Sequence, residues 1–82
     1  MPYIKQDDRQ ALDLHDVQPY TVGELNYVIT GILNRWIREH GGPGYATYNS
    51  IVGVLECAKL EFYRRACAPY EDTKILANGD VY

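Results

Sequence analysis

The sequence predicts an all-α protein built from a short N-terminal helix, a long antiparallel helical hairpin and a docked C-terminal tail. Three observations predict it. Apolar residues recur at helical spacing in two segments of similar length, a helix-start signal precedes the first of them, and a glycine-rich turn separates the two. We expect one domain over residues 1–82, organised as an arm (1–20), a hairpin (21–68) and a tail (69–82).

The arm is expected to contain one or two helical turns. Asp7 or Asp8 could cap a helix across the stretch "RQALDL", because an aspartate side chain accepts from backbone N–H groups of the first turn. Pro19 biases Gln18 away from helical angles, so the helix is expected to end before it.

The first long helix is expected over residues 21–40. "TVGE", Thr21 to Glu24, is a capping box, in which the threonine and glutamate side chains bond backbone N–H groups of the first turn. The apolar positions with helical spacing are Leu25, Ile29, Ile32, Leu33 and Trp36. "GGPG" (41–44) is expected to end the helix, because glycine accepts left-handed angles and proline cannot continue a helix.

The second long helix is expected from about residue 46 to 68, ending at Pro69. Its main apolar stripe consists of Ile51, Leu55, Ala58, Phe62 and Ala66, and the opposite face carries Gly53, Cys57, Leu60 and Cys67. A helix that is apolar almost all round is normally buried on most sides. We therefore expect a homo-oligomer, a dimer or larger, in which two hairpins complete a helical bundle. The alternative is a monomer whose arm and tail cover this helix.

The tail is unusually apolar for a chain end. Tyr70, Ile75, Leu76 and Tyr82 are expected to pack over the second helix of the same chain or of a partner, and Asn78 to Asp80 would supply a bend. The residues expected at the oligomer interface are Gly53, Cys57, Leu60, Tyr70 and Tyr82.

Composition restricts location and partners. The net charge of −3 argues against nucleic acid as a partner, because phosphate backbones are bound by clustered basic residues. No apolar run is long enough to span a bilayer, and no signal peptide is apparent, so we expect a cytoplasmic protein without a membrane partner. Cys57 and Cys67 lie about 15 Å apart along one helix, too far to form a disulfide within the chain.

No catalytic or metal-binding pattern is present. His15 and His40 have no Cys or carboxylate at helical ligand spacing, and His40 is expected to cap the C-terminus of the first long helix. Cys57 and Cys67 have no nearby histidine and are expected to be buried structural residues. We therefore expect no metal, no cofactor and no enzymatic activity.

Two sets of residues are candidates for binding. Tyr27, Thr30, Asn34 and Arg38 form one stripe on the first long helix, with Asn26 at its edge, and this polar, weakly charged, aromatic face suits a ligand or a protein partner. The alternative for this face is helix packing in an oligomer. Tyr63, with Arg64 and Arg65, could meet a ring and a phosphate, although Glu61 could also pair with Arg65 within the helix.

Five segments carry a resemblance that covers nearly the whole chain. They are "MPYIKQDDR", "GELNYVIT", "VGVLECAKLEFYRR", "APYED" and "NGDVY". With them the chain resembles an uncharacterised family of small phage and bacterial proteins, known as a domain-of-unknown-function family. The resemblance implies a phage, prophage or bacterial setting, and it implies no catalytic or binding residue.

From these observations we expect a non-enzymatic binding protein. One hypothesis is a sponge that sequesters a small nucleotide-like host immune signal at a subunit interface. Its candidate ligand contacts are Asn26, Tyr27, Thr30, Asn34, Tyr63, Arg64 and Arg65. The other hypothesis is a protein–protein interaction module, an inhibitor or adaptor that uses the same face of the first long helix to bind a host protein.

Overall fold

A computed structural model describes residues 2–14 and 17–82, and within these ranges the protein is helical with no strand. Its elements are α1 (Gln6–Asp13), α2 (Val22–Glu39), α3 (Tyr45–Phe62), a π-helical turn η1 (Tyr63–Cys67) and α4 (Ala68–Asn78). The all-α prediction is confirmed. The chain divides into two compact units, Met1–Thr47 and Tyr48–Tyr82, and each is described by itself. The expectation for His15 lies outside the described residues.

The arm contains the expected helix, but its predicted cap is wrong. Helix α1 starts three residues earlier than "RQALDL", and its N-cap residue is Lys5, whose side chain makes no capping hydrogen bond. Asp7 and Asp8 instead lie within the first turn. Carboxylates are favourable there because the helix dipole is positive at its N-terminus, so the same residues stabilise the helix start by a different interaction.

Helix α2 begins with the predicted capping box. The Glu24 backbone N–H donates to the Thr21 hydroxyl oxygen over 3.1 Å, and the Glu24 carboxylate accepts from the backbone N–H of Tyr20 over 2.9 Å. The glutamate thus reaches one residue further back than the usual pattern, in which it bonds the N–H of the cap residue itself. Two of the free donors at this helix start are satisfied locally, which fixes where α2 begins.

The C-terminus of α2 also lies where the sequence predicts it. His40 is the C-cap residue, and its Nδ1 lies 2.8 Å from the carbonyl oxygen of Trp36, while its ring stacks on the Trp36 indole at 4.1 Å between centroids. Gly41 and Gly42 adopt φ values of 92° and 83°, a conformation that favours glycine. The Gly42 N–H donates to the Ile37 carbonyl, which closes the helix end.

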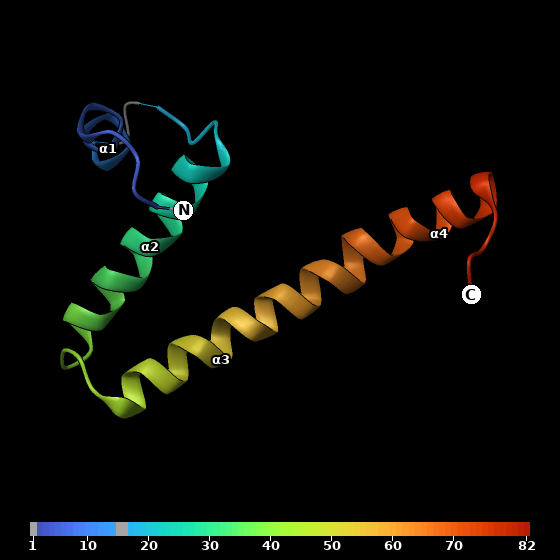
Figure 1. Cartoon of the computed structure of the whole chain (residues 1–82). Coiled ribbons are helices and arrows are strands. Elements are labelled where there is room, and N and C mark those ends of the chain that lie inside the picture. The colour runs from blue at the N-terminus through green and yellow to red at the C-terminus, as the bar shows by residue number, and fades with distance from the viewer. Residues whose placement is uncertain (1, 15–16) are drawn as a thin grey trace. The chain divides into compact units, whose positions relative to one another are not determined.

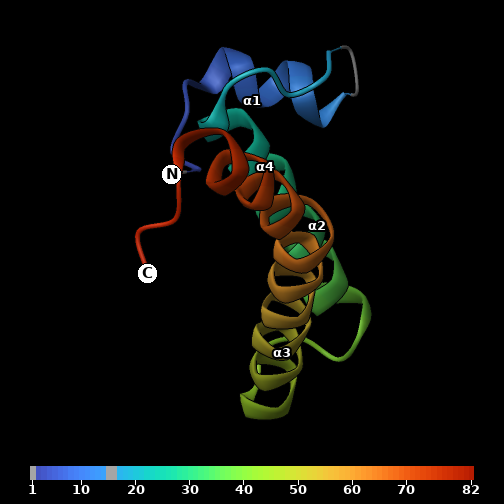
Figure 2. The ribbon, with the colours of Figure 1, turned by 90° about the vertical axis from the view of Figure 1, so that its right-hand side faces the viewer.

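The first unit is held together by the packing of α1 against α2. The two helices lie beside each other in both ribbon views (Figures 1 and 2). Leu12 of α1 is the one buried hydrophobic residue among those described, with 5% of its surface exposed. An apolar core this small contributes little free energy of folding, so the polar contacts between α1 and α2 matter for their packing.

The predicted end of the second long helix is wrong. The chain does not leave the helix at Pro69 but continues from α3 through η1 into α4, as one unbroken ribbon (Figure 1). In η1 the Ala68 N–H donates to the Tyr63 carbonyl, five residues back, and Pro69 lies in the first turn of α4. Proline lacks an N–H and its ring crowds the carbonyl four residues earlier. The wider π turn accommodates both effects.

Residues 69–82 therefore do not pack over the second long helix of the same chain, which was one of the two predicted alternatives. Ten of them, up to Asn78, are helical, and Tyr70, Ile75, Leu76 and Tyr82 are exposed. The predicted bend is correctly placed: Gly79 has φ 93°, and its N–H donates to the Ile75 carbonyl over 2.8 Å. The chain end after it is fixed by the Tyr82 N–H, which donates to the Asp80 carboxylate.

The residues predicted at an oligomer interface are accessible in the chain. Gly53, Cys57, Leu60, Tyr70 and Tyr82 are all exposed. Within the single chain Cys57 is exposed and Cys67 is half-buried, and both are free thiols. No helix among the described residues is long and apolar enough to cross a membrane.

The capping box gives a first testable prediction. Replacing Thr21 with alanine should lower the free energy of unfolding by about 1 kcal/mol, because the Glu24 N–H loses its acceptor. Thermal unfolding followed by circular dichroism measures the loss. Thr21→Ser keeps the oxygen and should stay near the wild-type midpoint, and equal midpoints for the alanine and serine variants would contradict this role.

Candidate functional site

A groove lies between the end of α1 and the exposed face of α2, within the first unit. Its volume is about 650 Å³. Leu12 and Asp13 of α1 form one side, and the other carries the polar face of α2 with Tyr27, Thr30, Asn34, Arg35 and Arg38. Sites for small ligands have volumes in this range, so the groove is large enough for a molecule of nucleotide size.

Tyr27 is fixed in the groove by α1. Its hydroxyl donates to the carboxylate of Asp13 and lies 2.9 Å from each carboxylate oxygen. The guanidinium of Arg9 lies 5.8 Å from the centroid of the Tyr27 ring, and Arg9 Nε donates to the carbonyl oxygen of Ile4 over 2.8 Å. The Tyr27 ring is therefore held in place at one side of the groove, and its hydroxyl is already hydrogen-bonded within the protein.

The contact with Asp13 raises the pKa of Tyr27 above its ordinary value of 10.0, chiefly because the phenol donates a hydrogen bond to the carboxylate. Partial desolvation and the negative charge of Asp13 act in the same direction, while the nearby charge of Arg9 opposes them. A raised pKa in the folded state favours the neutral phenol. The resulting stabilisation is present below pH 10 and is lost as the pH rises through the folded pKa.

The other polar residues of the groove differ in whether their side chains already form hydrogen bonds within the protein. The Thr30 hydroxyl donates to the backbone carbonyl of Asn26 over 2.8 Å and lies 3.3 Å from the Asn26 amide oxygen. The side chains of Asn34, Arg35 and Arg38 make no hydrogen bond or ion pair with any residue that the structure describes. They are exposed, and their donors are available to a ligand.

The structure thus brings together part of the predicted binding set. Tyr27, Thr30 and Asn34 line the groove, and Asn26 lies beside it as the acceptor for Thr30. Arg35 and Asp13 were not among the candidates. Arg35 lies eight residues after Tyr27, a spacing that keeps it near the same helix face, whereas nothing in the sequence pairs Asp13 with Tyr27.

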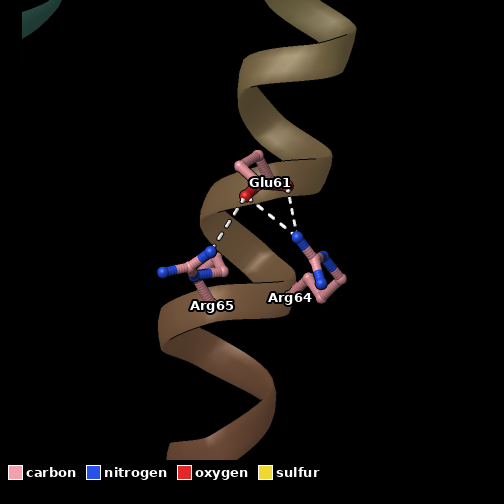
Figure 3. A network of polar contacts seen from close by, with 3 residues as sticks. All are labelled: Glu61, Arg64 and Arg65. Carbon is pink, nitrogen blue, oxygen red and sulfur yellow. Dashed lines mark hydrogen bonds and ion pairs between the residues drawn. The ribbon is translucent and has the colours of Figure 1, made fainter.

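Tyr63, Arg64 and Arg65 belong to the second unit and are engaged with neighbours on their own helix. Glu61 accepts from Arg64 Nη2 at 3.0 and 2.9 Å, and Arg65 Nη1 lies 3.7 Å from it (Figure 3). The alternative in which Glu61 pairs with Arg65 is confirmed. These exposed pairs contribute little stability, but they leave Arg64 and Arg65 partly neutralised.

Tyr63 spans the π turn. Its hydroxyl donates to the Glu71 carboxylate over 2.5 Å, and this bond raises the pKa of Tyr63, with the charge of Glu71 as the next cause. The contact connects η1 to α4 across two helical turns, so Tyr63 has a structural partner on the far side of Pro69.

The polar groups of the described residues that line the groove are a carboxylate, two hydroxyls, an amide and two guanidinium groups. Among the described residues its lining includes no histidine, cysteine or serine, and its carboxylate, that of Asp13, accepts the hydrogen bond of Tyr27. Across residues 2–14 and 17–82, no three His, Cys, Asp or Glu side chains gather as a metal site would require. Guanidinium and amide donors beside an aromatic ring and apolar side chains are instead suited to binding an anion that carries a ring.

Comparison with known proteins places the chain in a family. A family model described as Domain of unknown function (DUF6899) matches residues 1–81. The chain belongs to this family. Neither the curated proteins nor the solved structures contain a match to it. The resemblance expected from the sequence segments is confirmed at the level of an uncharacterised family.

The bond between Asp13 and Tyr27 gives a second prediction. Asp13→Asn should lower the pKa of Tyr27 toward 10.0, because the charged acceptor is removed. The Cζ chemical shifts of the tyrosines, followed against pH by NMR, measure this. Tyr63, whose partner is Glu71, is the internal control and should not move. A Tyr27 titration unchanged by the substitution would show that the bond does not exist in solution.

Proposed function

We propose that the protein is a non-enzymatic binding protein that sequesters a small, nucleotide-like anion in the groove between α1 and α2. The observation that supports this most directly is the set of available donors on Asn34, Arg35 and Arg38 beside the fixed ring of Tyr27. The proposal is confined to this groove. Tyr63, Arg64 and Arg65 are left out of it because they have partners on their own helix.

Each part of the groove has a role in this proposal. The guanidinium groups of Arg35 and Arg38, three residues apart on α2, would bind a phosphate through charge-assisted hydrogen bonds. The Asn34 amide can donate to and accept from the polar edge of a base or a sugar hydroxyl. The exposed part of the Tyr27 ring and the apolar side chains of Leu12, Val28 and Ile32 would contact a flat ring.

Sequestration rather than turnover fits the chemistry of these residues. The Asp13 carboxylate is already hydrogen-bonded to Tyr27, and the other charged groups of the groove are guanidiniums, which bind anions rather than accept protons. A phage, prophage or bacterial setting, implied by the resemblance of the sequence segments, would make a host immune signal the natural ligand. This extension is an analogy with small nucleotide-binding sponge proteins, and no motif in the chain carries it.

A second candidate function is supported by a different observation. The first unit exposes large apolar side chains along α2, including Leu25, Ile29, Ile32 and Trp36. Apolar residues at helical spacing on an exposed face are suited to a protein partner. In this candidate the protein is an inhibitor or adaptor, and the groove is part of a larger contact surface.

Native mass spectrometry with a panel of cyclic and ADP-ribose-type nucleotides tests the first candidate. We expect a stoichiometric adduct with at least one of them. Arg38→Gln should weaken it about tenfold or more, because a hydrogen bond to a charged group contributes about 1.5–3 kcal/mol. Asn34→Ala should also weaken binding without unfolding the chain.

Arg65→Gln is the matched control, since it removes the same charge from the second unit and should leave the affinity unchanged. Absence of any adduct from the wild-type protein would contradict the proposal and favour the protein-partner candidate. An adduct that Arg65→Gln weakens as much as Arg38→Gln would place the ligand outside the groove.

A further inference from the structure

We propose that the groove between α1 and α2 holds its ligand in one orientation, with a phosphate at Arg35 and Arg38 and a base that carries an exocyclic amino group at Asp13. Asp13 is then the residue that selects the base. This inference rests on the proposed function and names the class of nucleotide that the groove takes. It follows from the unequal distribution of charge along the groove.

The charged residues that line the groove lie at its two ends. Asp13 lies beside Tyr27, whose hydroxyl donates to the Asp13 carboxylate. Arg35 and Arg38 follow Tyr27 by eight and eleven residues along α2, which places their backbone about 12 Å and 16 Å further along the helix axis. Among the described residues of the lining these three carry the only charges. A ligand in the groove therefore meets a negative end and a positive end.

The space between the two ends is open along one face of α2. Asn34 and Arg38 follow Tyr27 by about two and three whole turns, so the three residues form a row on the helix. Gly31 lies in the same stretch, and no heavy atom comes within 4 Å of the position that its Cβ would occupy. The Cα–Cβ bonds of a helix tilt toward its N-terminus, so the arginine side chains start in the direction of Tyr27. One extended molecule can therefore contact both ends.

The Asp13 carboxylate can accept a second hydrogen bond. The Tyr27 hydroxyl oxygen lies 2.9 Å from each carboxylate oxygen, so its single hydrogen occupies the side between them. An ionised carboxylate accepts at about four lone-pair positions. Asp13 is exposed, and no other side chain of the described residues donates to it. The outer lone pairs of the two oxygens are thus directed at a donor on the ligand.

This carboxylate distinguishes between bases. Adenine and cytosine carry an amino group where hypoxanthine and uracil carry a carbonyl oxygen. The amino group donates to Asp13, whereas the carbonyl oxygen would leave two acceptors facing each other without a hydrogen between them. A base with an exocyclic amino group is therefore favoured, and its ring lies beside the ring of Tyr27.

The reverse orientation is unfavourable. A phosphate at the first end of the groove would face the negative charge of Asp13, and like charges placed side by side oppose binding. Arg9 also lies near this end, with its guanidinium 5.8 Å from the centroid of the Tyr27 ring and its Nε bonded to the Ile4 carbonyl. It is not among the described residues that line the groove. The phosphate is therefore drawn to the arginines of α2.

Equilibrium dialysis of the full chain against AMP, IMP, CMP and UMP tests the proposal. The bases of AMP and IMP differ chiefly in one substituent, an amino group in the first and a carbonyl in the second, and so do those of CMP and UMP. We expect AMP to bind at least tenfold more tightly than IMP, and CMP at least tenfold more tightly than UMP. The factor is that of one hydrogen bond to a charged group.

Two substitutions separate the ends of the groove, with adenosine added as a ligand that lacks the phosphate. Asp13→Asn should bring the ratio of AMP to IMP affinity close to one, because an amide both donates and accepts and so matches either base. It should leave the ratio of AMP to adenosine affinity little changed. Arg38→Gln should have the opposite effect on the two ratios. Glu71→Gln is the matched control, since it neutralises the carboxylate that accepts from Tyr63 in the second unit, and should change neither ratio.

The outcomes distinguish this inference from the proposed function. Equal affinities for AMP and IMP in the wild-type protein would overturn the inference and leave the proposed function standing. So would a tenfold preference for AMP that persists in a folded Asp13→Asn variant. A protein that binds neither AMP nor CMP overturns the inference, and if it also forms no adduct with the wider panel of nucleotides the proposed function is overturned with it. The wild-type comparison needs no substitution, so a poorly folded variant does not weaken the test.

Discussion

The shortage of buried apolar surface is the constraint on which the rest of this structure depends. One side chain, Leu12, is buried among the described hydrophobic residues, and residues 48–78 of the second unit form a single helix. Short chains generally need an added source of stability, such as a metal, disulfides or another subunit. Here Cys57 and Cys67 are free thiols. The apolar side chains of the long helix therefore stay accessible to solvent in the single chain.

Where packing is scarce, local polar contacts determine the arrangement. Two tyrosine–carboxylate hydrogen bonds illustrate this. Tyr27 donates to Asp13 and so ties α1 to α2 at the groove, while Tyr63 donates to Glu71 and so connects the helix on the two sides of Pro69. The same chemistry joins two helices in one unit and reinforces a wide turn in the other. The shape of the candidate ligand site follows from the first of these bonds.

Much of this fold could be predicted from the sequence because its determinants are local. The Thr21 cap and Gly41 act on neighbouring residues, so the bounds of α2 were predicted to within one residue. The predicted helix end at Pro69 was wrong because proline is tolerated in the first turn of a helix. Pro69 occupies such a position only because a π turn precedes it. Asp13 could not be found from the sequence, since its contact with Tyr27 bridges fourteen positions and depends on how α1 packs.

The candidate site was predictable to a similar degree and for the same reason. Tyr27, Thr30 and Asn34 share a face of one helix, which follows directly from helical periodicity. The prediction that Tyr63, Arg64 and Arg65 would join them needed knowledge of tertiary contacts. It also ignored how readily Glu61 neutralises arginines three and four residues away.

The π turn also changes which side chains share a face along the long helix. A five-residue spacing in place of four adds one residue to the turn, so side chains that share a face before Tyr63 no longer continue on that face after Cys67. The face that begins at Gly53 is consequently finite, and α4 points its own residues in another direction. A helix lying straight along α3 would lose register at η1. The π turn therefore limits the length over which a straight helix could follow one face of α3.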